Sequence, residues 1–182
     1  MKHFYQNISG FSSFKEQGCL LHLVLHNLPE IQKLKIAEVG VYQGRGTAIW
    51  VVELLNKNLD FEYTAIDHFM GSSEHDPEFG YYESTKNNLK PIDRFVKIMN
   101  QTSFESAQNF DDESLDLIYI DASHDYDSVL NDLKSWFPKL KKGGIICGDD
   151  YIDGWPGVVS AVDEFFDSKI NKFGIQQWWT IK

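Results

Sequence analysis

Cysteine, positive charge and long apolar runs are all scarce in this chain of 182 residues. Its two cysteines, Cys19 and Cys147, are too few for a disulfide framework, so we expect a reduced, cytoplasmic setting. No stretch approaches the roughly 18–20 apolar residues that are needed to span a bilayer. The first residues carry no apolar signal core either, so we expect neither membrane insertion nor export.

Negative charge outweighs positive charge, because 27 Asp and Glu residues face 17 Lys and Arg residues and leave a net charge of −10. A surface this acidic repels phosphate backbones and anionic lipid, which argues against nucleic acid or membrane as the main partner. The content of 42% hydrophobic and 24% charged residues is close to the globular average. We therefore expect a single domain over residues 1–182 that buries its own core.

Apolar runs with the character of strands alternate with runs that have the period of a helix. Strands are predicted at residues 35–41, 61–66, 94–99, 115–120 and 145–148, and a terminal hairpin at 173–181. Helices are predicted at residues 14–28, 47–56, 81–90, 103–109, 128–140 and 158–166, with Gly143 and Gly144 ending the helix at 128–140. This alternation predicts a doubly wound α/β fold, with a mostly parallel sheet and helices on both faces. A helical segment, residues 1–34, precedes the core at 35–182.

A glycine-rich turn follows the first predicted strand. Gly40, Gly44 and Gly46 have the spacing G-x-x-x-G-x-G, with Glu38 just before them and Thr47 at the start of the next helix. Glycines let such a turn tighten and let the backbone approach a ligand, so we expect a nucleotide-type cofactor here. The spacing is neither the dinucleotide fingerprint nor a phosphate loop. An ordinary strand-to-helix turn is the alternative.

Asp67 ends the second predicted strand, 21 positions after Gly46. An acid on the strand beside a glycine turn can accept hydrogen bonds from both ribose hydroxyls of a nucleoside. The alternative is an aspartate that serves only its own turn. The turn and the acid together favour a nucleoside-containing cofactor without naming it.

Acidic residues also follow the fourth and fifth predicted strands, Asp121 after one, Asp149 and Asp150 after the other. If the two strands pair, the three carboxylates converge and repel one another unless a cation, a proton or a base lies between them. Oxygen ligands suit Mg²⁺, Mn²⁺ or Ca²⁺. His124, three residues past Asp121, is placed to act as a general base or a further ligand. Helix capping by single aspartates is the alternative.

Taken together, these motifs resemble the class I S-adenosylmethionine-dependent methyltransferases over about residues 35–165. The metal-dependent O-methyltransferase branch, with macrocin-type and catechol-type enzymes, is the most similar. The resemblance implies a seven-stranded Rossmann-like sheet, with residues 38–47 against the methionine part of the cofactor and Asp67 on the ribose. It also implies adenine contacts from Phe69 and from residues 99–103, which include Thr102 and Ser103.

That branch has the pattern I-D-G-x-H-x-Y, then D-L, G-G and D-D-Y. Similar residues occur here at 120–126, at Asp132-Leu133, at Gly143-Gly144 and at 149–151, with alanine at position 122 in place of glycine. By this resemblance Asp121, Asp149 and Asp150 are ligands of a divalent cation, Mg²⁺ first among them. His124 stands where catechol-type enzymes have a catalytic lysine. The implied reaction moves a methyl group to a hydroxyl of a small molecule, such as a sugar or a phenol. The cation lowers the pKa of that hydroxyl, and Asp121 or His124 removes the proton.

Two other interpretations stay open. A short-chain NAD(P)-dependent reductase also uses G-x-x-x-G-x-G, and Tyr82 and Lys86 have the spacing of its catalytic pair, but they come too early in the chain. A non-catalytic cofactor-binding module is the second. Aromatic residues gather at both chain ends, at Phe4, Tyr5, Trp178 and Trp179 among others, where they could cover an interface such as that of a homodimer. Packing within the domain is the simpler explanation.

Overall fold

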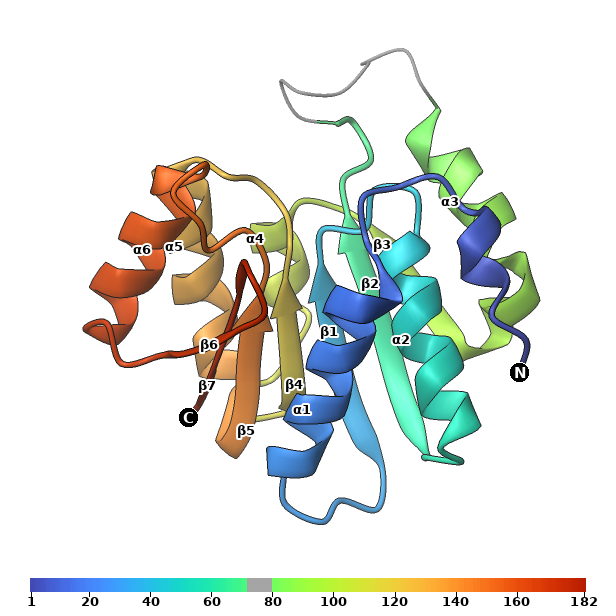
Figure 1. Cartoon of the computed structure of the whole chain (residues 1–182), viewed down its shortest axis with the longest axis horizontal. Coiled ribbons are helices and arrows are strands. Elements are labelled where there is room, and N and C mark those ends of the chain that lie inside the picture. The colour runs from blue at the N-terminus through green and yellow to red at the C-terminus, as the bar shows by residue number, and fades with distance from the viewer. Residues whose placement is uncertain (72–79) are drawn as a thin grey trace.

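The computed structural model describes residues 1–71 and 80–182 and has one seven-stranded sheet at its centre (Figure 1). The strand order is β3-β2-β1-β4-β5-β7-β6. The first five strands in this order are parallel, and β7 runs antiparallel to both β5 and β6. The bounds are β1 (Leu34–Val39), β2 (Phe61–Asp67), β3 (Val96–Asn100), β4 (Leu115–Ile120), β5 (Leu140–Gly148), β6 (Asn171–Phe173) and β7 (Gln177–Ile181). The doubly wound, mostly parallel sheet is confirmed.

Helices cover both faces of the sheet, because successive residues of each buried strand point to opposite sides. Leu117 and Tyr119 of β4 pack into one core with α1 (Cys19–Asn27), α2 (Arg45–Asn56) and α3 (Tyr81–Leu89). Ile118 and Ile120 pack into the other core with α4 (Ser103–Ala107), α5 (Tyr126–Trp136) and α6 (Pro156–Phe166). Every residue of β4 is buried, as expected for the central region of a parallel sheet covered on both faces.

The helix predicted at residues 128–140 ends earlier, and its last part is different. Helix α5 stops at Trp136, a 3-10 turn follows at Phe137–Lys139, and Leu140 already belongs to β5. Pro138 has no N–H to donate and its ring clashes with the preceding turn, so the α-helix cannot continue through it. Gly143 and Gly144 therefore lie inside β5 rather than at a helix end. Gly143, with φ +79°, lies where the pairing of β5 with β4 shifts register.

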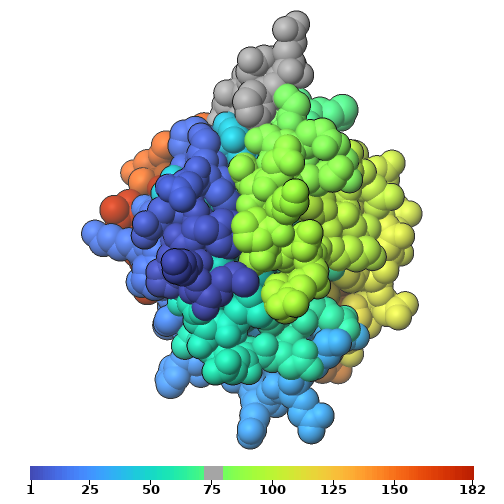
Figure 2. Space-filling model, turned by 90° about the vertical axis from the view of Figure 1, so that its right-hand side faces the viewer, coloured from blue at the N-terminus to red at the C-terminus, as the bar shows by residue number. Residues whose placement is uncertain are grey.

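The N-terminal segment is more irregular than the predicted helix at residues 14–28. A single π-turn (Phe14–Gly18) precedes α1, and a 3-10 turn (Phe4–Asn7) lies before it. In Figure 2 the first residues of the chain lie beside α3. Strand β3 also begins two residues later than predicted, because Lys90–Phe95 forms a 3-10 turn. The terminal hairpin is confirmed as β6 and β7.

The lengths and apolar character of the helices bear on membrane insertion. Within residues 1–71 and 80–182, none is both long and apolar enough to cross one.

Candidate active site

A cavity of about 360 Å³ opens where the parallel strands end. Residues from the β1–α2 turn, from the ends of β2, β4 and β5, and from the N-terminal segment line it together. Of the residues singled out in the sequence, the cavity is lined by Glu38, Gly40, Gly46, Asp67, Phe69, Ser103, Asp121, His124 and Asp150. Gly44, Thr47, Thr102 and Asp149 are not among the lining residues. The glycine turn and most of the acids therefore share one space.

Gly40 permits the close approach on which this arrangement depends. Its φ is +93°, and a Cβ atom placed on it would lie 1.9 Å from the backbone oxygen of Asp121. Asp121 in turn donates its N–H to the carbonyl of Val39 at 2.8 Å. Only glycine lets the ends of β1 and β4 come together at this distance. Gly44, with φ +84°, then starts α2, whose first residues, Arg45 and Gly46, face the cavity.

Glu38 is buried beneath the turn, and two hydroxyl groups donate to its Oε2 atom. Its carboxylate accepts a hydrogen bond from Thr47 Oγ1 at 2.5 Å and from Tyr63 Oη at 2.9 Å. Burial raises the pKa of Glu38 to about 7, although both hydrogen bonds act in the opposite direction. Thr47 thus acts on Glu38 rather than on the cavity.

Asp67 holds the glycine turn in shape. Its Oδ2 accepts the backbone N–H groups of Val41 at 2.8 Å and Tyr42 at 2.9 Å, and its Oδ1 accepts the N–H of Phe69 at 2.7 Å. A carboxylate has about four acceptor positions, so one position on Oδ1 has no partner among the described residues. The sequence left open an aspartate that serves its own turn, as in the bond to Phe69, but the two bonds to the glycine turn were not anticipated.

The residues predicted beside the adenine have unequal positions. Phe69 lines the cavity, and its ring centre lies 5.3 Å from that of Tyr82. Ser103 also lines it, but its hydroxyl donates to Asp132 and accepts from Trp136 Nε1. Thr102 instead caps α4 in a capping box with Glu105, so its role in the described structure is local.

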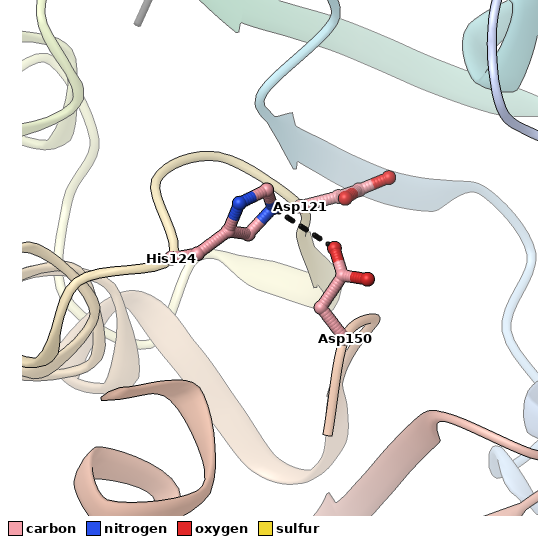
Figure 3. A group of neighbouring side chains, drawn as sticks. All are labelled: Asp121, His124 and Asp150. Carbon is pink, nitrogen blue, oxygen red and sulfur yellow. Dashed lines mark ion pairs between the residues drawn. The ribbon is translucent and has the colours of Figure 1, made fainter. Parts of the chain in front are cut away.

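Asp121, His124 and Asp150 form the acidic centre of the site (Figure 3). Each offers one ligand atom, and these atoms all lie within 4.8 Å of one another. The Nε2 atom of His124 lies 3.0 Å from Oδ2 of Asp150, and the His124 ring packs on Trp155 with 4.1 Å between ring centres. The pairing of β4 with β5, with Ile120 opposite Gly148, brings the two acids together as predicted.

Asp149 lies beside this centre but outside the three-residue group. Its Oδ1 accepts the backbone N–H of Asp150 at 2.9 Å and the side-chain amide of Gln177 at 3.1 Å. The hydroxyl of Tyr119 lies 3.1 Å from Asp121 Oδ2 and 3.4 Å from Asp149 Oδ2. Having one proton, it can donate to only one of them at a time.

The charges at this centre are unbalanced. Burial raises the pKa of Asp121 well above its usual range, and the neighbouring carboxylates of Asp149 and Asp150 raise it further. Burial also raises the pKa of Asp149. A divalent cation would relieve this repulsion, and two carboxylates with one imidazole are a donor set that Mg²⁺ or Mn²⁺ can use. The residues present therefore fit a divalent cation.

Comparison with known proteins shows the family to which the chain belongs. The methyltransferase domain family matches residues 37–151, which is more than half of the chain and runs from the glycine turn to the acidic centre. The chain belongs to the methyltransferase domain family. This methyltransferase is also 25% identical over 150 residues to the protein y4gI of Sinorhizobium fredii, covering 80% of this chain but 14% of that one. A protein of Acanthamoeba polyphaga mimivirus, R132, is 40% identical over 52 residues, or 28% of this chain and 24% of that one. The chain thus spans a quarter or less of the curated relatives that it matches.

Solved structures share the fold. An S-adenosylmethionine-dependent O-methyltransferase from Thermotoga maritima superposes with a TM-score of 0.70 at 11% identity, covering 100% of this chain and 71% of that one. The S-adenosylhomocysteine-bound methyltransferase PaMTH1 from Podospora anserina gives 0.68 at 16% identity, with 99% and 86% covered. CalS11, a TDP-rhamnose 3′-O-methyltransferase of calicheamicin biosynthesis, gives 0.68 at 17% identity, with 92% and 77% covered. The class I methyltransferase fold inferred from the sequence is confirmed.

The reductase interpretation gains no support from the positions of Tyr82 and Lys86. Lys86 forms an ion pair with Glu83 at 3.1 Å on α3, and neither Tyr82 nor Lys86 is among the residues that line the cavity. The site also includes residues that the sequence analysis did not select. Gln17 donates its side-chain amide to Asp121 Oδ2 at 3.1 Å from 104 positions away, and residues 10–12 form part of the cavity wall.

Proposed function

We propose that this methyltransferase transfers a methyl group from S-adenosylmethionine to a hydroxyl of a small molecule with the help of a divalent cation. The observation that carries the proposal is the shared cavity. The glycine turn and Asp67 line the same 360 Å³ space as Asp121, His124 and Asp150. A cofactor on the turn would thus be next to an acceptor at the acidic centre, and such proximity is the main requirement of a methyl transfer.

The cofactor would lie with its methionine part against Gly40 and Gly46, its ribose at Asp67 and its adenine at Phe69. The one available acceptor position on Asp67 Oδ1 favours a bond to one ribose hydroxyl rather than two. Arg45 and Gly46 at the start of α2 line the cavity, so the positive end of this helix would favour the methionine carboxylate there. Glu38 would contribute indirectly, by holding Thr47 and the floor of the turn.

The cation would be held by Asp121 and Asp150, and His124, although near enough to be a ligand, is assigned to the proton instead. The family pattern also implies Asp149 as a ligand, but Oδ1 of Asp149 already accepts two hydrogen bonds. Bound S-adenosylmethionine would supply the methyl group, and a bound Mg²⁺ would lower the pKa of the acceptor hydroxyl. His124 is the proposed base, with Asp121 as the alternative. The Asp150 carboxylate, 3.0 Å from Nε2, would stabilise the imidazolium once His124 takes the proton.

The charge of the cavity bears on the acceptor. Glu38, Asp67, Asp121 and Asp150 line it, whereas the lining residue with permanent positive charge in the described chain is Arg45. Arg45 Nη1 already donates to the backbone carbonyl of Gly10 at 2.9 Å. A phosphate-bearing acceptor would therefore meet repulsion with few basic partners. We favour a sugar-like or phenol-like hydroxyl compound without phosphate, in a cytoplasmic setting supported by the two free cysteines.

The test combines binding with turnover. Calorimetry should detect S-adenosylhomocysteine, and NADH should not compete with it. Methyl transfer from labelled S-adenosylmethionine to a panel of phenols and sugars should require Mg²⁺, should stop in excess chelator and should resume when Mg²⁺ is restored. Chelation should leave cofactor binding intact. Full turnover in excess chelator would leave the acids as proton carriers or caps, and binding of NADH in place of S-adenosylhomocysteine would reject the proposal.

A further inference from the structure

Three glutamine side chains each donate an amide hydrogen bond to one of the three acids. Gln17 Nε2 lies 3.1 Å from Asp121 Oδ2, and Gln177 Nε2 lies 3.1 Å from Asp149 Oδ1. Gln176 Nε2 lies 3.2 Å from Asp150 Oδ1. Gln17 comes from the start of the chain and the other two from its last hairpin. Both ends of the chain therefore meet the carboxylates that follow β4 and β5.

The burial of Gln17 and Gln177 shows that these bonds are not incidental. Each side chain is 1% exposed. In each, the carbonyl oxygen Oε1 is buried and has no hydrogen-bond partner among the described residues. An unpaired buried acceptor costs roughly 1–3 kcal/mol. Turning either amide around would place a carbonyl against a carboxylate, so the acids themselves fix the orientation of both amides.

Local structure places each glutamine with little freedom. Gln17 lies in the π-turn that Ser13 caps, and its backbone N–H donates to the carbonyl of Ser13 at 2.9 Å. Gln177 is the first residue of β7, and the pairing of Trp178 with Gly148 sets it directly opposite the residue after β5. That residue is Asp149. The sheet register thus delivers the Gln177 amide to its acceptor.

Asp149 in turn holds the backbone of Asp150. The same Oδ1 atom that accepts the Gln177 amide also accepts the backbone N–H of Asp150. Asp150 has φ +61°, a left-handed conformation that a residue other than glycine adopts only when its surroundings stabilise it. In this conformation the Asp150 carboxylate lies 3.0 Å from Nε2 of His124.

We propose that Gln17 and Gln177 are positioning residues for the divalent cation. Gln17 fixes the carboxylate of Asp121. Gln177 fixes that of Asp149, which then acts as a bracket for Asp150 rather than as a ligand. This inference rests on the divalent cation of the proposed function, and it names the side chains that hold the carboxylates around that cation in place. An N-terminal turn and a C-terminal strand hold together a centre that lies between them in the sequence.

The experiment measures the affinity of the full chain for Mn²⁺ by calorimetry, with no acceptor present. The variants Gln17→Met and Gln177→Met keep the side-chain length and lose the amide donor. The matched control is Gln108→Met, at an exposed glutamine beyond the end of α4. Partners of metal ligands typically contribute ~10–100-fold to affinity. We expect losses of that size for the first two variants and none for the control.

A second set of variants keeps the test informative if a glutamine variant does not fold. Asp149→Asn retains an oxygen that can accept both the Asp150 N–H and the Gln177 amide, so Mn²⁺ affinity should fall only by the effect of one lost neighbouring charge. Asp121→Asn and Asp150→Asn should each weaken it strongly. A loss in Asp149→Asn as large as in Asp121→Asn or Asp150→Asn would make Asp149 a ligand and overturn its role as a bracket.

The outcomes separate this inference from the proposed function. If the wild-type protein binds Mn²⁺ and both glutamine variants that fold bind it equally well, the positioning role is wrong and the proposed function stands. If the wild-type protein binds S-adenosylhomocysteine but no Mn²⁺, the metal-dependent part of the proposed function is wrong, and this inference is overturned with it.

Discussion

Gly40→Ala tests the close approach between the ends of β1 and β4. A methyl group at this position would lie 1.9 Å from the backbone oxygen of Asp121 and 2.7 Å from Cα of Ala122. Both neighbours are backbone, so no side chain can rotate away and the loop after β4 must move. The variant also places an alanine at φ +93°. We therefore expect two separate costs, one from conformation and one from overlap.

Gly143→Ala is the matched control, because Gly143 also has positive φ, +79°, but a Cβ atom there would meet nothing within 4 Å. The left-handed conformation costs an L residue roughly 1–2 kcal/mol, and this should be the whole effect at Gly143. Overlap in a packed region adds ~1–3 kcal/mol at Gly40. The difference between the two variants should therefore be ~1–3 kcal/mol in the free energy of unfolding.

Urea unfolding of both variants, followed by circular dichroism, measures that difference. Gly40→Ala should also weaken binding of S-adenosylhomocysteine, because Gly40 and Asp121 both line the cavity. Gly143→Ala should leave that affinity unchanged, since Gly143 is not a lining residue. Equal losses of stability in the two variants would show that the β4 loop yields without cost, and the reasoning from close approach would be wrong.

Further predictions concern single side chains of the site. Asp67→Ala should weaken S-adenosylhomocysteine binding at least tenfold by calorimetry, because a hydrogen bond to a charged group contributes roughly 1.5–3 kcal/mol. Glu38 has a pKa raised to about 7 in the folded protein, so it destabilises the fold as pH rises from its unfolded value near 4.5 to 7. In urea titrations across that range, Glu38→Gln should gain about 3 kcal/mol relative to wild type, and a constant difference would refute the shift. His124→Ala should lower kcat by ~10²–10⁴ if His124 is the base. Rescue by high Mg²⁺ would instead make it a ligand.

The fold and the proximity of Asp121 and Asp150 could both be predicted from the sequence. Alternating apolar runs such as residues 35–41 and 115–120 can be satisfied only by a covered parallel sheet. Once β4 and β5 are neighbours, Asp121 and Asp150 must lie at the same edge. Thr102 was assigned to the adenine by resemblance, although Glu105 follows at the capping-box spacing and indicates the capping role that the structure shows.

The rest depended on geometry that no local pattern records. The left-handed backbone of Asp150 turns its carboxylate toward His124 and leaves Asp149 in contact with Gln177. Gln17 reaches Asp121 across 104 positions, and a glutamine near an apolar helix carries no periodic signal that would reveal such a contact. Asp67 was selected for its acidity, but its bonds to two N–H groups of the turn depend on how β1 and β2 end side by side.

The hydrogen bonds of Asp67 also affect the entropy of binding. Since one carboxylate holds the backbone amides of Val41, Tyr42 and Phe69, the turn has few conformations left to lose when a ligand binds. A preordered loop of this kind spares a ligand much of the ordering cost that a flexible loop would impose. The three amides should accordingly exchange slowly with deuterium before any cofactor is added, and they should become fast together in Asp67→Ala.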